Sequence, residues 1–360
     1  MNKIPKSIVF CGGGTGGHIF PAVAIANEFR SRFPEAKILF IGALGKMEME
    51  KIPQEGYEIV GLPVMGLNRK AKLSNIKVVI KAIYSYFKAI GILLKAKPEA
   101  VIGTGGYASL PVSLAAITVR IPVFAWEGNA FAGLSNKLIR NWARLFFCGF
   151  GGMEKHFPKG NWIHSGNPVR LEIKEKADKV IAANHFKLDP TKPIIFVTGG
   201  SLGARSINDA IANGIDKLHN SGIQVIWQTG ANYEIPKSIP KSVWVSPFLR
   251  EMNMAYSCAD IIISRSGALS VAEIMVTGVP VIFVPSSNVT DDHQSINAEM
   301  TTEQGGGILI PDDEAKEMLI NQAIDLIHDT LKRESMKAAL AILARPNATA
   351  QITDEIIKRL

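Results

Sequence analysis

Seven residues near the start of the chain, Gly12 to His18, have the types and spacing of a phosphate-binding loop. They read Gly-Gly-Gly-Thr-Gly-Gly-His and lie between an apolar run, Ser7 to Cys11, and a helical pattern that starts near Pro21. Glycines let the backbone approach a phosphate closely, and the amides and dipole of a helix N-terminus favour an anion. A second loop of this kind, Thr198 to Gly203, follows the apolar run Ile194 to Val197. The sequence therefore predicts two anion-binding loops.

A third loop, residues 264–273, carries a carboxylate as well as a helix start. Ser264 ends an apolar run, Gly267 allows a turn, and Glu273 lies inside the helix that follows. Backbone amides at such a helix start suit a diphosphate, and the Glu273 carboxylate suits the hydroxyls of a ribose. An ordinary capping box, with Ser270 as the cap and Glu273 completing it, explains the same residues. The loop alone leaves both interpretations open.

The first glycine loop also matches the G-x-G-x-x-G pattern of nicotinamide-dinucleotide enzymes, through Gly12, Gly14 and Gly17. Those enzymes hold the ribose with an acidic residue about 20 positions further on, at the end of the second strand. Here that strand ends in Phe40 to Gly45, which contains no carboxylate. The sequence therefore argues against a nicotinamide-dependent oxidoreductase.

Apolar runs that read as strands alternate with helical patterns along the whole chain. The predicted strands are Ser7–Cys11, Lys37–Ile41, Tyr57–Val64, Ala100–Gly103, Ile121–Trp126, Leu145–Phe150, Ile194–Thr198, Ile223–Gln228, Val243–Ser246, Asp260–Ser264 and Val279–Val284. This alternation is typical of parallel α/β sheets, whose ligands bind at the carboxyl ends of the strands. Because each half has its own glycine loop, we predict two doubly wound domains, residues 1–166 and 167–345, divided at a turn-forming cluster. Residues 346–360 are predicted to form a helix that packs back on the first domain.

Composition and charge fit two domains with different partners. The chain has 360 residues and is 47% hydrophobic, more than one ordinary core requires. Residues 1–165 carry 21 Lys and Arg against 9 Asp and Glu, whereas residues 166–360 carry 19 against 23. The basic first half predicts an anionic partner, either membrane lipid or nucleic acid. Three isolated cysteines and the lack of an apolar leader at the N-terminus predict a cytosolic protein with reduced thiols.

Residues 74–97 predict an amphipathic helix with an unusual distribution of charge. At about 100° per residue, four lysines form a narrow stripe and seven apolar residues form a broad face beside it: Lys77, Lys81, Lys88 and Lys95, and Ile76, Val79, Ile80, Ile83, Phe87, Ile90 and Leu94. The lysines argue against a membrane span, which needs about 20 nearly uncharged residues. The apolar face can cover the sheet, and the helix can lie on a membrane surface with help from Arg69, Lys70 and Lys72; the two interpretations can hold together, because the core can use only part of so wide a face.

Five motifs occur in order along the chain: Gly13-Gly14-Thr15-Gly16-Gly17-His18-Ile19-Phe20-Pro21, Gly105-Gly106-Tyr107, Gly166-Asn167-Pro168-Val169-Arg170, Gly199-Gly200-Ser201-Leu202-Gly203-Ala204, and Arg265-Ser266-Gly267-Ala268 with Glu273. Together they resemble the MurG family, the peripheral membrane UDP-N-acetylglucosamine transferases of bacterial peptidoglycan synthesis. The resemblance covers nearly the whole chain. It implies an α/β GT-B glycosyltransferase fold, with two Rossmann-like domains facing a cleft. The N-terminal domain would hold a lipid-linked acceptor and the C-terminal domain the sugar nucleotide, with no nucleic acid as partner.

The resemblance implies an inverting transfer of N-acetylglucosamine (GlcNAc) from UDP-GlcNAc. The acceptor is the C4 hydroxyl of the N-acetylmuramoyl sugar (MurNAc) in undecaprenyl-diphosphoryl-MurNAc-pentapeptide. Positions that match the family's donor contacts are Thr15, Gly16, Gly17, Asn129, Arg170, Ser201, Leu249, Ala268, Leu269, Ser270, Val271, Ala272, Glu273 and Gln294.

The chemistry of these side chains assigns roles within the implied donor site. Arg170 and Ser201 suit the diphosphate, and Glu273 suits the ribose. Gln294 and Asn129 suit the sugar hydroxyls, and the Leu249 backbone suits uracil. Tyr107, on the Gly105-Gly106 loop, is expected to shape the acceptor site.

His18 is our candidate for the general base, because an imidazole at the positive end of a helix is expected to stay neutral near pH 7. A contact with a phosphate or with the local backbone explains His18 equally well. Glu127, just after a predicted strand, is the rival base. The family often reads His-Glu-Gln-Asn where this chain has Trp126-Glu127-Gly128-Asn129, so no side-chain role transfers to Trp126 or Gly128.

We predict no cofactor and no structural metal, with Mg²⁺ at most as a loose counterion of the diphosphate. Asp291 and Asp292 are adjacent acidic residues on a loop, which are more often solvated than bound to metal. The expected location is the cytoplasmic face of the bacterial plasma membrane. Two other classes stay open: a soluble UDP-GlcNAc 2-epimerase, which does not need the basic helix, and an inactive nucleotide-sensing membrane adaptor.

Overall fold

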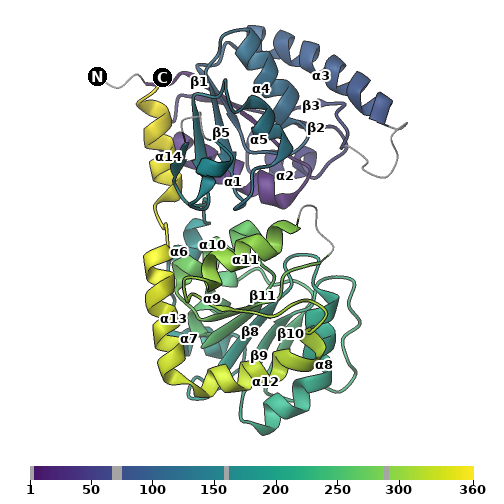
Figure 1. The fold of residues 1–360 in the computed structure, drawn as a ribbon, viewed down its shortest axis with the longest axis vertical. Helices are drawn as coiled ribbons and strands as arrows, with labels where there is room; N and C mark the ends of the chain where they lie inside the picture. The colour runs from purple at the N-terminus through teal and green to yellow at the C-terminus, as the bar shows by residue number, and fades with distance from the viewer. Residues whose placement is uncertain (1–3, 67–74, 158–161, 288–291) are drawn as a thin grey trace. The chain divides into compact units, whose positions relative to one another are not determined.

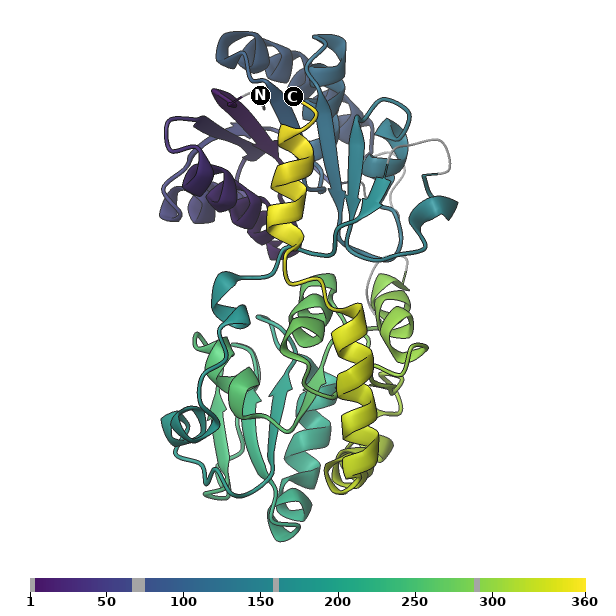
Figure 2. The same cartoon turned by 90° about the vertical axis from the view of Figure 1, so that its left-hand side faces the viewer.

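The computed structural model describes residues 4–66, 75–157, 162–287 and 292–360. The chain divides into two compact units, Met1–Pro168 with Asn347–Leu360 and Val169–Pro346, which we call unit 1 and unit 2. The last helix, α14 (Ala348–Ile357), packs against α1 (Gly16–Arg32) in unit 1 (Figure 2).

Unit 1 contains a parallel sheet in the order β3-β2-β1-β4-β5-β6-β7 (Figure 1). Its strands are β1 (Ser7–Cys11), β2 (Lys37–Ala43), β3 (Glu58–Leu62), β4 (Ala100–Gly103), β5 (Val123–Glu127), β6 (Leu145–Cys148) and β7 (Trp162–His164). The chain runs from β1 to β3 on one side and then returns to the other side of β1 at β4. This reversal places a topological switch point between β1 and β4, where ligands bind in open α/β sheets.

Unit 2 repeats this arrangement with the sheet order β10-β9-β8-β11-β12-β13. Its strands are β8 (Ile194–Thr198), β9 (Gln224–Gln228), β10 (Val243–Ser246), β11 (Ile261–Ser264), β12 (Val281–Phe283) and β13 (Ile308–Leu309). Here the switch point lies between β8 and β11. Both sheets are parallel at every pairing, as the alternation of strands and helices predicts.

Helices connect the strands and cover both sheets. In unit 1 they are α1, α2 (Glu48–Gln54), α3 (Asn75–Ala96), α4 (Ser109–Thr118), α5 (Leu134–Ile139), a short 3₁₀ turn (Met153–Lys155) and α14. In unit 2 they are α6 (Leu171–Lys174), α7 (Lys179–His185), α8 (Arg205–Asn220), α9 (Met252–Cys258), α10 (Ala268–Thr277), α11 (His293–Thr302), α12 (Ala315–His328) and α13 (Thr330–Leu343).

Each sheet is buried because its strands are short continuous apolar runs. Ile8, Val9 and Phe10 in β1 are fully buried, and the face of α1 that spacing predicts, Ala22 to Phe29, covers this sheet. The sequence did not predict β7 and β13, which have three and two residues and lie at the edges of their sheets. Runs this short carry no detectable period.

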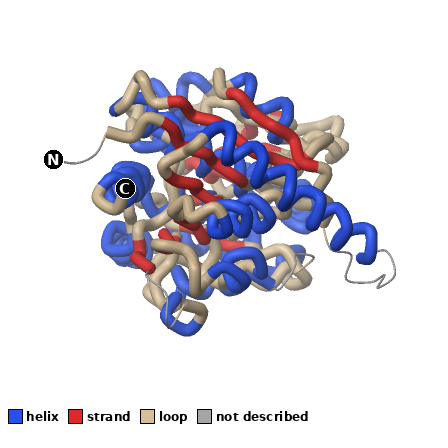
Figure 3. The backbone as a smooth tube through the Cα atoms, turned by 90° about the horizontal axis from the view of Figure 1, so that it is seen from above, coloured by secondary structure: helices blue, strands red, loops and turns tan. Residues whose placement is uncertain are grey.

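The apolar face of α3 is mostly exposed, which corrects the interpretation that it covers the sheet. Seven large side chains on this helix are 53% to 64% exposed: Ile76, Val79, Ile80, Ile83, Tyr84, Phe87 and Leu94. The buried side of α3 consists chiefly of four residues, two of which have small side chains: Val78, Ser85, Ala89 and Leu93. The N-terminal turns of α3 extend past the rest of unit 1 (Figures 1 and 3). The basic residues expected to assist this helix, Arg69, Lys70 and Lys72, lie outside the described residues.

The lysine stripe on α3 is less uniform than the sequence predicts. Lys77, Lys81 and Lys95 are exposed, whereas Lys88 is half-buried and its Nζ donates to the Gly61 carbonyl over 3.0 Å. Lys88 therefore holds the end of β3 rather than contributing only surface charge.

Candidate active site

The predicted binding loops follow the strands on either side of each switch point. In unit 1, residues 12–15 follow β1 and residues 104–108 follow β4. In unit 2, residues 199–204 follow β8 and residues 265–267 follow β11. Because the carboxyl ends of parallel strands share one edge of the sheet, each pair of loops meets at that edge.

His18 lies in the first turn of α1, and its ring contacts the loop after β4. Its Nδ1 is 2.9 Å from the carbonyl oxygen of Thr104. A carbonyl only accepts hydrogen bonds, so in the neutral form of the ring the proton lies on Nδ1 and the lone pair on Nε2. A Cβ at Gly105, where φ is +92°, would lie 2.7 Å from Nδ1, so glycine permits this contact. Held in this tautomer, His18 can accept a proton at Nε2.

Glu48, which the sequence did not single out, binds the first glycine loop. Its Oε2 accepts from the Gly14 amide over 3.0 Å, and its Oε1 accepts from the Ala43 amide over 2.9 Å. The side chain is almost fully buried, and a Cβ at Gly13 would lie 2.0 Å from Oε1. The group bound by the Gly14 amide is thus the protein's own Glu48 carboxylate, whose two donors lie in the loop after β1 and at the end of β2.

Tyr107, in the loop after β4, and Glu127, the last residue of β5, lie at the same edge of the unit 1 sheet. The Tyr107 side chain is half exposed, and its ring packs so closely on Gly66 that a Cβ there would lie 2.4 Å from Cζ. The Glu127 carboxylate is buried and accepts from the backbone amide of Gly133 (2.7 Å) and from Asn136 Nδ2 (3.0 Å).

The Glu127 carboxylate is also a partner of Asn129, which a family resemblance assigned to the sugar. The Asn129 amide donates to Oε1 over 3.3 Å, and its side chain hydrogen-bonds Glu127 as well. Burial raises the pKa of Glu127 above its ordinary value, although these hydrogen bonds oppose the shift. Both carboxylate oxygens therefore hold the loop that follows β5.

Arg170 and Glu273, predicted to bind the diphosphate and the ribose, form an ion pair in unit 2. Arg170 Nε and Nη2 donate to the two Glu273 oxygens over 3.0 and 3.3 Å. The Tyr256 hydroxyl, which is buried in α9, donates to Glu273 Oε2 over 3.2 Å. Burial, followed by the Glu273 charge, raises the pKa of Tyr256 well above its ordinary value, so it remains a donor. Glu273 is thus held by two partners, and Tyr256 is a further residue that the sequence did not single out.

The start of α10 excludes the capping-box interpretation of residues 270–273. The helix begins at Ala268, and its N-cap is Gly267, without a side-chain cap. Ser270 therefore lies inside the helix, and Glu273 is occupied by Arg170 and Tyr256 rather than by the helix start. Ala268, Leu269, Ser270 and Ala272 are half-buried, whereas Val271 packs into the core.

The remaining predicted donor contacts lie in both units. Ser201 is exposed in the loop after β8, and Leu249 follows β10 with its side chain buried, which leaves its backbone as the group that can face a ligand. Gln294 is the second residue of α11 and accepts from the Ser286 amide through Oε1 over 2.9 Å. Thr15, Gly16 and Gly17 lie in unit 1, at the N-cap and first turn of α1.

No group of three or more His, Cys, Asp or Glu side chains in the described parts of the chain could hold a metal ion. Asp291 lies outside the described residues, and Asp292 accepts from Ser295 Oγ over 2.7 Å.

Both units match families of known proteins. The profile of the glycosyltransferase family 28 N-terminal domain matches residues 8–147, and that of the glycosyltransferase family 28 C-terminal domain matches residues 194–352. Two relatives named UDP-N-acetylglucosamine–N-acetylmuramyl-(pentapeptide) pyrophosphoryl-undecaprenol N-acetylglucosamine transferase come from Flavobacterium psychrophilum and Cytophaga hutchinsonii. They are 44% and 42% identical, over 97% and 98% of this chain and 96% and 97% of theirs. The chain belongs to the MurG family.

A solved structure supports this assignment to the MurG family. The crystal structure of Acinetobacter baumannii MurG matches with a TM-score of 0.79 and 27% identity, over 99% of this chain and 100% of that one. The resemblance predicted from five motifs and the GT-B fold class are therefore confirmed. A UDP-GlcNAc 2-epimerase from Neisseria meningitidis bound to UDP-GlcNAc also matches, with a TM-score of 0.70 and 16% identity over 98% of this chain and 100% of that one. At that identity the likeness concerns the fold alone.

Proposed function

We propose that this protein transfers GlcNAc from UDP-GlcNAc to the C4 hydroxyl of MurNAc in undecaprenyl-diphosphoryl-MurNAc-pentapeptide, which converts lipid I into lipid II. The observation that carries the proposal is identity above 40% to MurG-family transferases over nearly the full length of both chains. An imidazole, a guanidinium, a carboxylate and helix amides in the two units supply the chemistry that this reaction needs.

The donor would bind to unit 2 through groups that are already neighbours. Arg170 offers positive charge to the diphosphate, and Glu273 offers a carboxylate to the ribose hydroxyls. These two groups pair with each other here, and a ribose carrying a diphosphate requires them to be adjacent. The half-buried start of α10 adds backbone amides for the departing UDP.

The transfer is a single displacement with inversion. A base takes the proton of the C4 hydroxyl, its oxygen forms a bond to C1 of GlcNAc, and the bond from C1 to the diphosphate breaks with UDP taking the electron pair. His18 is our proposed base, because its contact with Thr104 leaves the lone pair on Nε2. Glu127 is proposed as a positioning residue instead, since its oxygens are occupied by its own loop.

The proposed reaction uses no bound cofactor, and Mg²⁺ acts at most as a loose counterion of the diphosphate. Arg170 and helix amides can offset the charge that develops on UDP. Transfer that continues, within about twofold, after chelation with EDTA supports this proposal, and complete loss that added Mg²⁺ restores overturns it.

The exposed face of α3 is proposed to lie on an anionic membrane surface, which would place the protein at the cytoplasmic face of the bacterial plasma membrane. Its apolar side chains, from Ile76 to Leu94, suit the acyl boundary, and Lys77, Lys81 and Lys95 suit anionic headgroups. In the described part of the chain, no helix is long and apolar enough to cross a membrane.

The function is tested by supplying labelled UDP-GlcNAc with a lipid-linked MurNAc-pentapeptide and analysing the products. A labelled lipid-linked disaccharide supports the transferase. UDP-N-acetylmannosamine formed without acceptor would instead establish an epimerase, and donor binding without any product would establish an adaptor.

The membrane proposal is tested by partitioning on phosphatidylglycerol vesicles. Substituting Lys77, Lys81 and Lys95 with glutamine is expected to weaken binding roughly a hundredfold, since each lysine near an anionic surface contributes about 1 kcal/mol. Lys88 is kept because it bonds Gly61. The matched control replaces three exposed lysines of unit 2, Lys241, Lys316 and Lys332, and is expected to bind as the wild type does. Equal loss in both variants would show that only net charge matters.

A further inference from the structure

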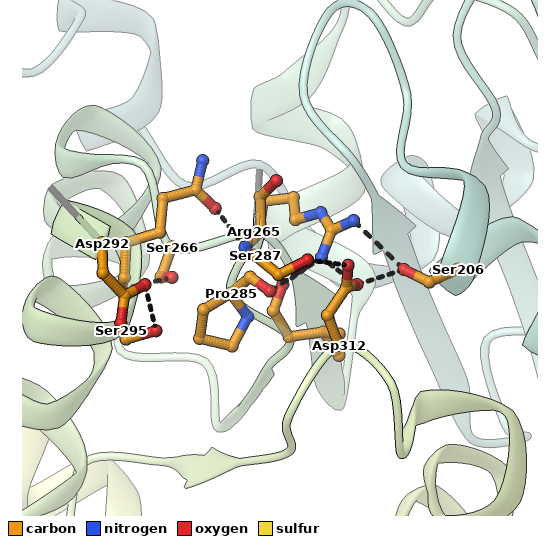
Figure 4. Close-up of polar contacts among 11 residues, drawn as sticks. Ser206, Arg265, Ser266, Pro285, Ser287, Asp292, Ser295 and Asp312 are labelled. Atoms are coloured by element: carbon orange, nitrogen blue, oxygen red, sulfur yellow. Dashed lines mark hydrogen bonds and ion pairs between the residues drawn. The ribbon is translucent and has the colours of Figure 1, made fainter. Parts of the chain in front are cut away.

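A cluster of polar side chains in unit 2 surrounds Arg265, a residue for which the proposed reaction gives no direct role (Figure 4). Arg265 directly follows β11, and its side chain is 13% exposed. The guanidinium donates to two carbonyls, a carboxylate and a hydroxyl: Val284 O at 2.8 Å, Pro285 O at 3.0 Å, Asp312 Oδ1 at 2.5 Å and Ser206 Oγ at 3.1 Å. One side chain therefore joins the loops that follow β11, β12 and β13 to the first turn of α8.

Asp312 is the charge that keeps this guanidinium in place. Its side chain is 15% exposed, and besides Arg265 it accepts hydrogen bonds from Ser206 Oγ at Oδ1 and from Ser287 Oγ at Oδ2, the latter over 3.3 Å. Burial alone would raise the pKa of Asp312, but the hydrogen bonds from Arg265 and Ser206 outweigh burial and lower it below the ordinary value. The carboxylate is thus ionised at neutral pH.

Two residues next to these contacts fix Gln294. Ser286, which follows Pro285, donates its backbone amide to Gln294 Oε1 over 2.9 Å. Ser266, which follows Arg265, donates its hydroxyl to the Gln294 carbonyl over 2.7 Å. Because Oε1 accepts from a backbone amide, the NH₂ end of Gln294 is turned away from Ser286 and can donate to a sugar hydroxyl.

We infer that Asp312 is a positioning residue for the sugar side of the donor site, acting through Arg265 on Gln294. The inference rests on the proposed function, in which Gln294 contacts GlcNAc. Without the Asp312 charge, a nearly buried guanidinium loses its counterion and must seek water. The Val284 and Pro285 carbonyls then lose their donor, and the adjacent Ser286 amide no longer holds Gln294 in one orientation.

The test compares the affinities of UDP-GlcNAc and UDP for Asp312→Asn by calorimetry. UDP-GlcNAc binding is expected to weaken about tenfold, as for the loss of one well-placed polar contact, while UDP binding stays within about twofold. Asp313→Asn is the matched control, because this neighbouring residue is exposed. Its affinities for both ligands are expected to equal those of the wild type.

Gln294→Ala provides the second arm of the test. It is expected to show the same selective loss for UDP-GlcNAc, and the double variant is expected to lose no more than either single one. If Asp312→Asn weakens UDP and UDP-GlcNAc equally, or lowers only the melting temperature, its role is structural and the inference fails. If the wild type binds UDP-GlcNAc but transfers no sugar, the proposed function fails, while the ratio of affinities still reports on Asp312.

Discussion

Glu127 and Glu273 are both buried carboxylates, but their partners differ in kind. Glu127 accepts from backbone amides of the loop that follows it and from the side-chain amide of Asn136 in α5. Glu273 is paired with a charged, half-exposed Arg170 and with Tyr256. A carboxylate that accepts hydrogen bonds from nearby amides stabilises the local backbone. A carboxylate that is paired with an accessible cation can instead exchange that partner for a ligand. The two residues therefore predict different consequences on substitution.

His18→Ala is expected to lower kcat by roughly a hundredfold or more, because a positioned general base contributes about that factor. Glu127→Gln is expected to lower the melting temperature while kcat changes by less than about tenfold, since an amide places a donor against the donors of Gly133 and Asn136. Steady-state transfer assays at saturating substrates, with melting curves, separate the two. Retained kcat in His18→Ala together with its loss in Glu127→Gln would move the base to Glu127.

Tyr256→Phe removes one hydrogen bond to Glu273 and is expected to raise KM for UDP-GlcNAc about fivefold, which corresponds to about 1 kcal/mol. With a donor whose ribose lacks both hydroxyls, the same substitution is expected to have no effect on KM. Tyr233→Phe is the matched control, because Tyr233 has its own carboxylate partner in unit 2, Asp209. An equal rise in KM for both donors would show that Tyr256 supports the fold rather than the ribose site.

For single residues, the sequence indicated those that belong to a recognisable motif. It did not indicate residues whose hydrogen-bond partners lie far away along the chain. Glu273 and Arg170 could be proposed from residue type and resemblance. Glu48 and Asp312 could not, because their partners Gly14 and Arg265 lie 34 and 47 positions away in the chain. Only the sheet, by bringing the ends of non-adjacent strands to one edge, makes these contacts.

Among the elements, the prediction succeeded for strands of four or five residues that form uninterrupted runs and failed for the two shortest strands, β7 and β13. The bounds of β1, β4, β8 and β10 agree with the predicted runs, because these strands lack polar interruptions or end at turn residues. The helix over α3 was predicted, but not which of its faces is buried. Periodicity identifies an apolar face without saying what covers it, and here the inward side is made of small residues such as Ser85 and Ala89.

Helix α14 shows how the end of the chain contributes to unit 1. Ile352 and Ile356 are fully buried, and Arg32 of α1 pairs with Asp354 over 2.5 Å. Ion pairs this exposed contribute little, so the apolar contacts are expected to hold the helix.

Ile352→Ala is expected to destabilise unit 1 by about 2–5 kcal/mol, because it leaves a cavity under α14. Gln351→Ala, at the exposed position next to it, is expected to change stability by less than about 0.5 kcal/mol. Urea unfolding followed by tryptophan fluorescence measures both. Equal stability of the two variants would show that α14 is not anchored through Ile352.

For the whole molecule, separate cores allow the two units to specialise. Unit 1 and unit 2 each have their own cluster of buried apolar residues, which includes Val9 of β1 in unit 1 and Ile195 of β8 in unit 2. Their charges differ as well, since unit 1 carries 23 Lys and Arg against 11 Asp and Glu, whereas unit 2 carries 17 against 21. We therefore expect an anionic surface to attract unit 1, and the exposed apolar face of α3 to contact that surface.

This division predicts that salt separates membrane binding from donor binding. Raising NaCl from about 0.1 to 1 M shortens the Debye length from about 10 to 3 Å, so attraction of the α3 lysines to phosphatidylglycerol vesicles is expected to fall at least tenfold. Part of the vesicle binding is expected to persist through the apolar face of α3, and substituting both Ile80 and Phe87 with serine is expected to remove that part.

The affinity for UDP-GlcNAc, measured by calorimetry without vesicles, is expected to fall less with salt than vesicle binding does, because Arg170 and Glu273 are partly shielded from solvent. Vesicle binding that ignores both salt and the double serine variant would place the membrane contact elsewhere on the chain.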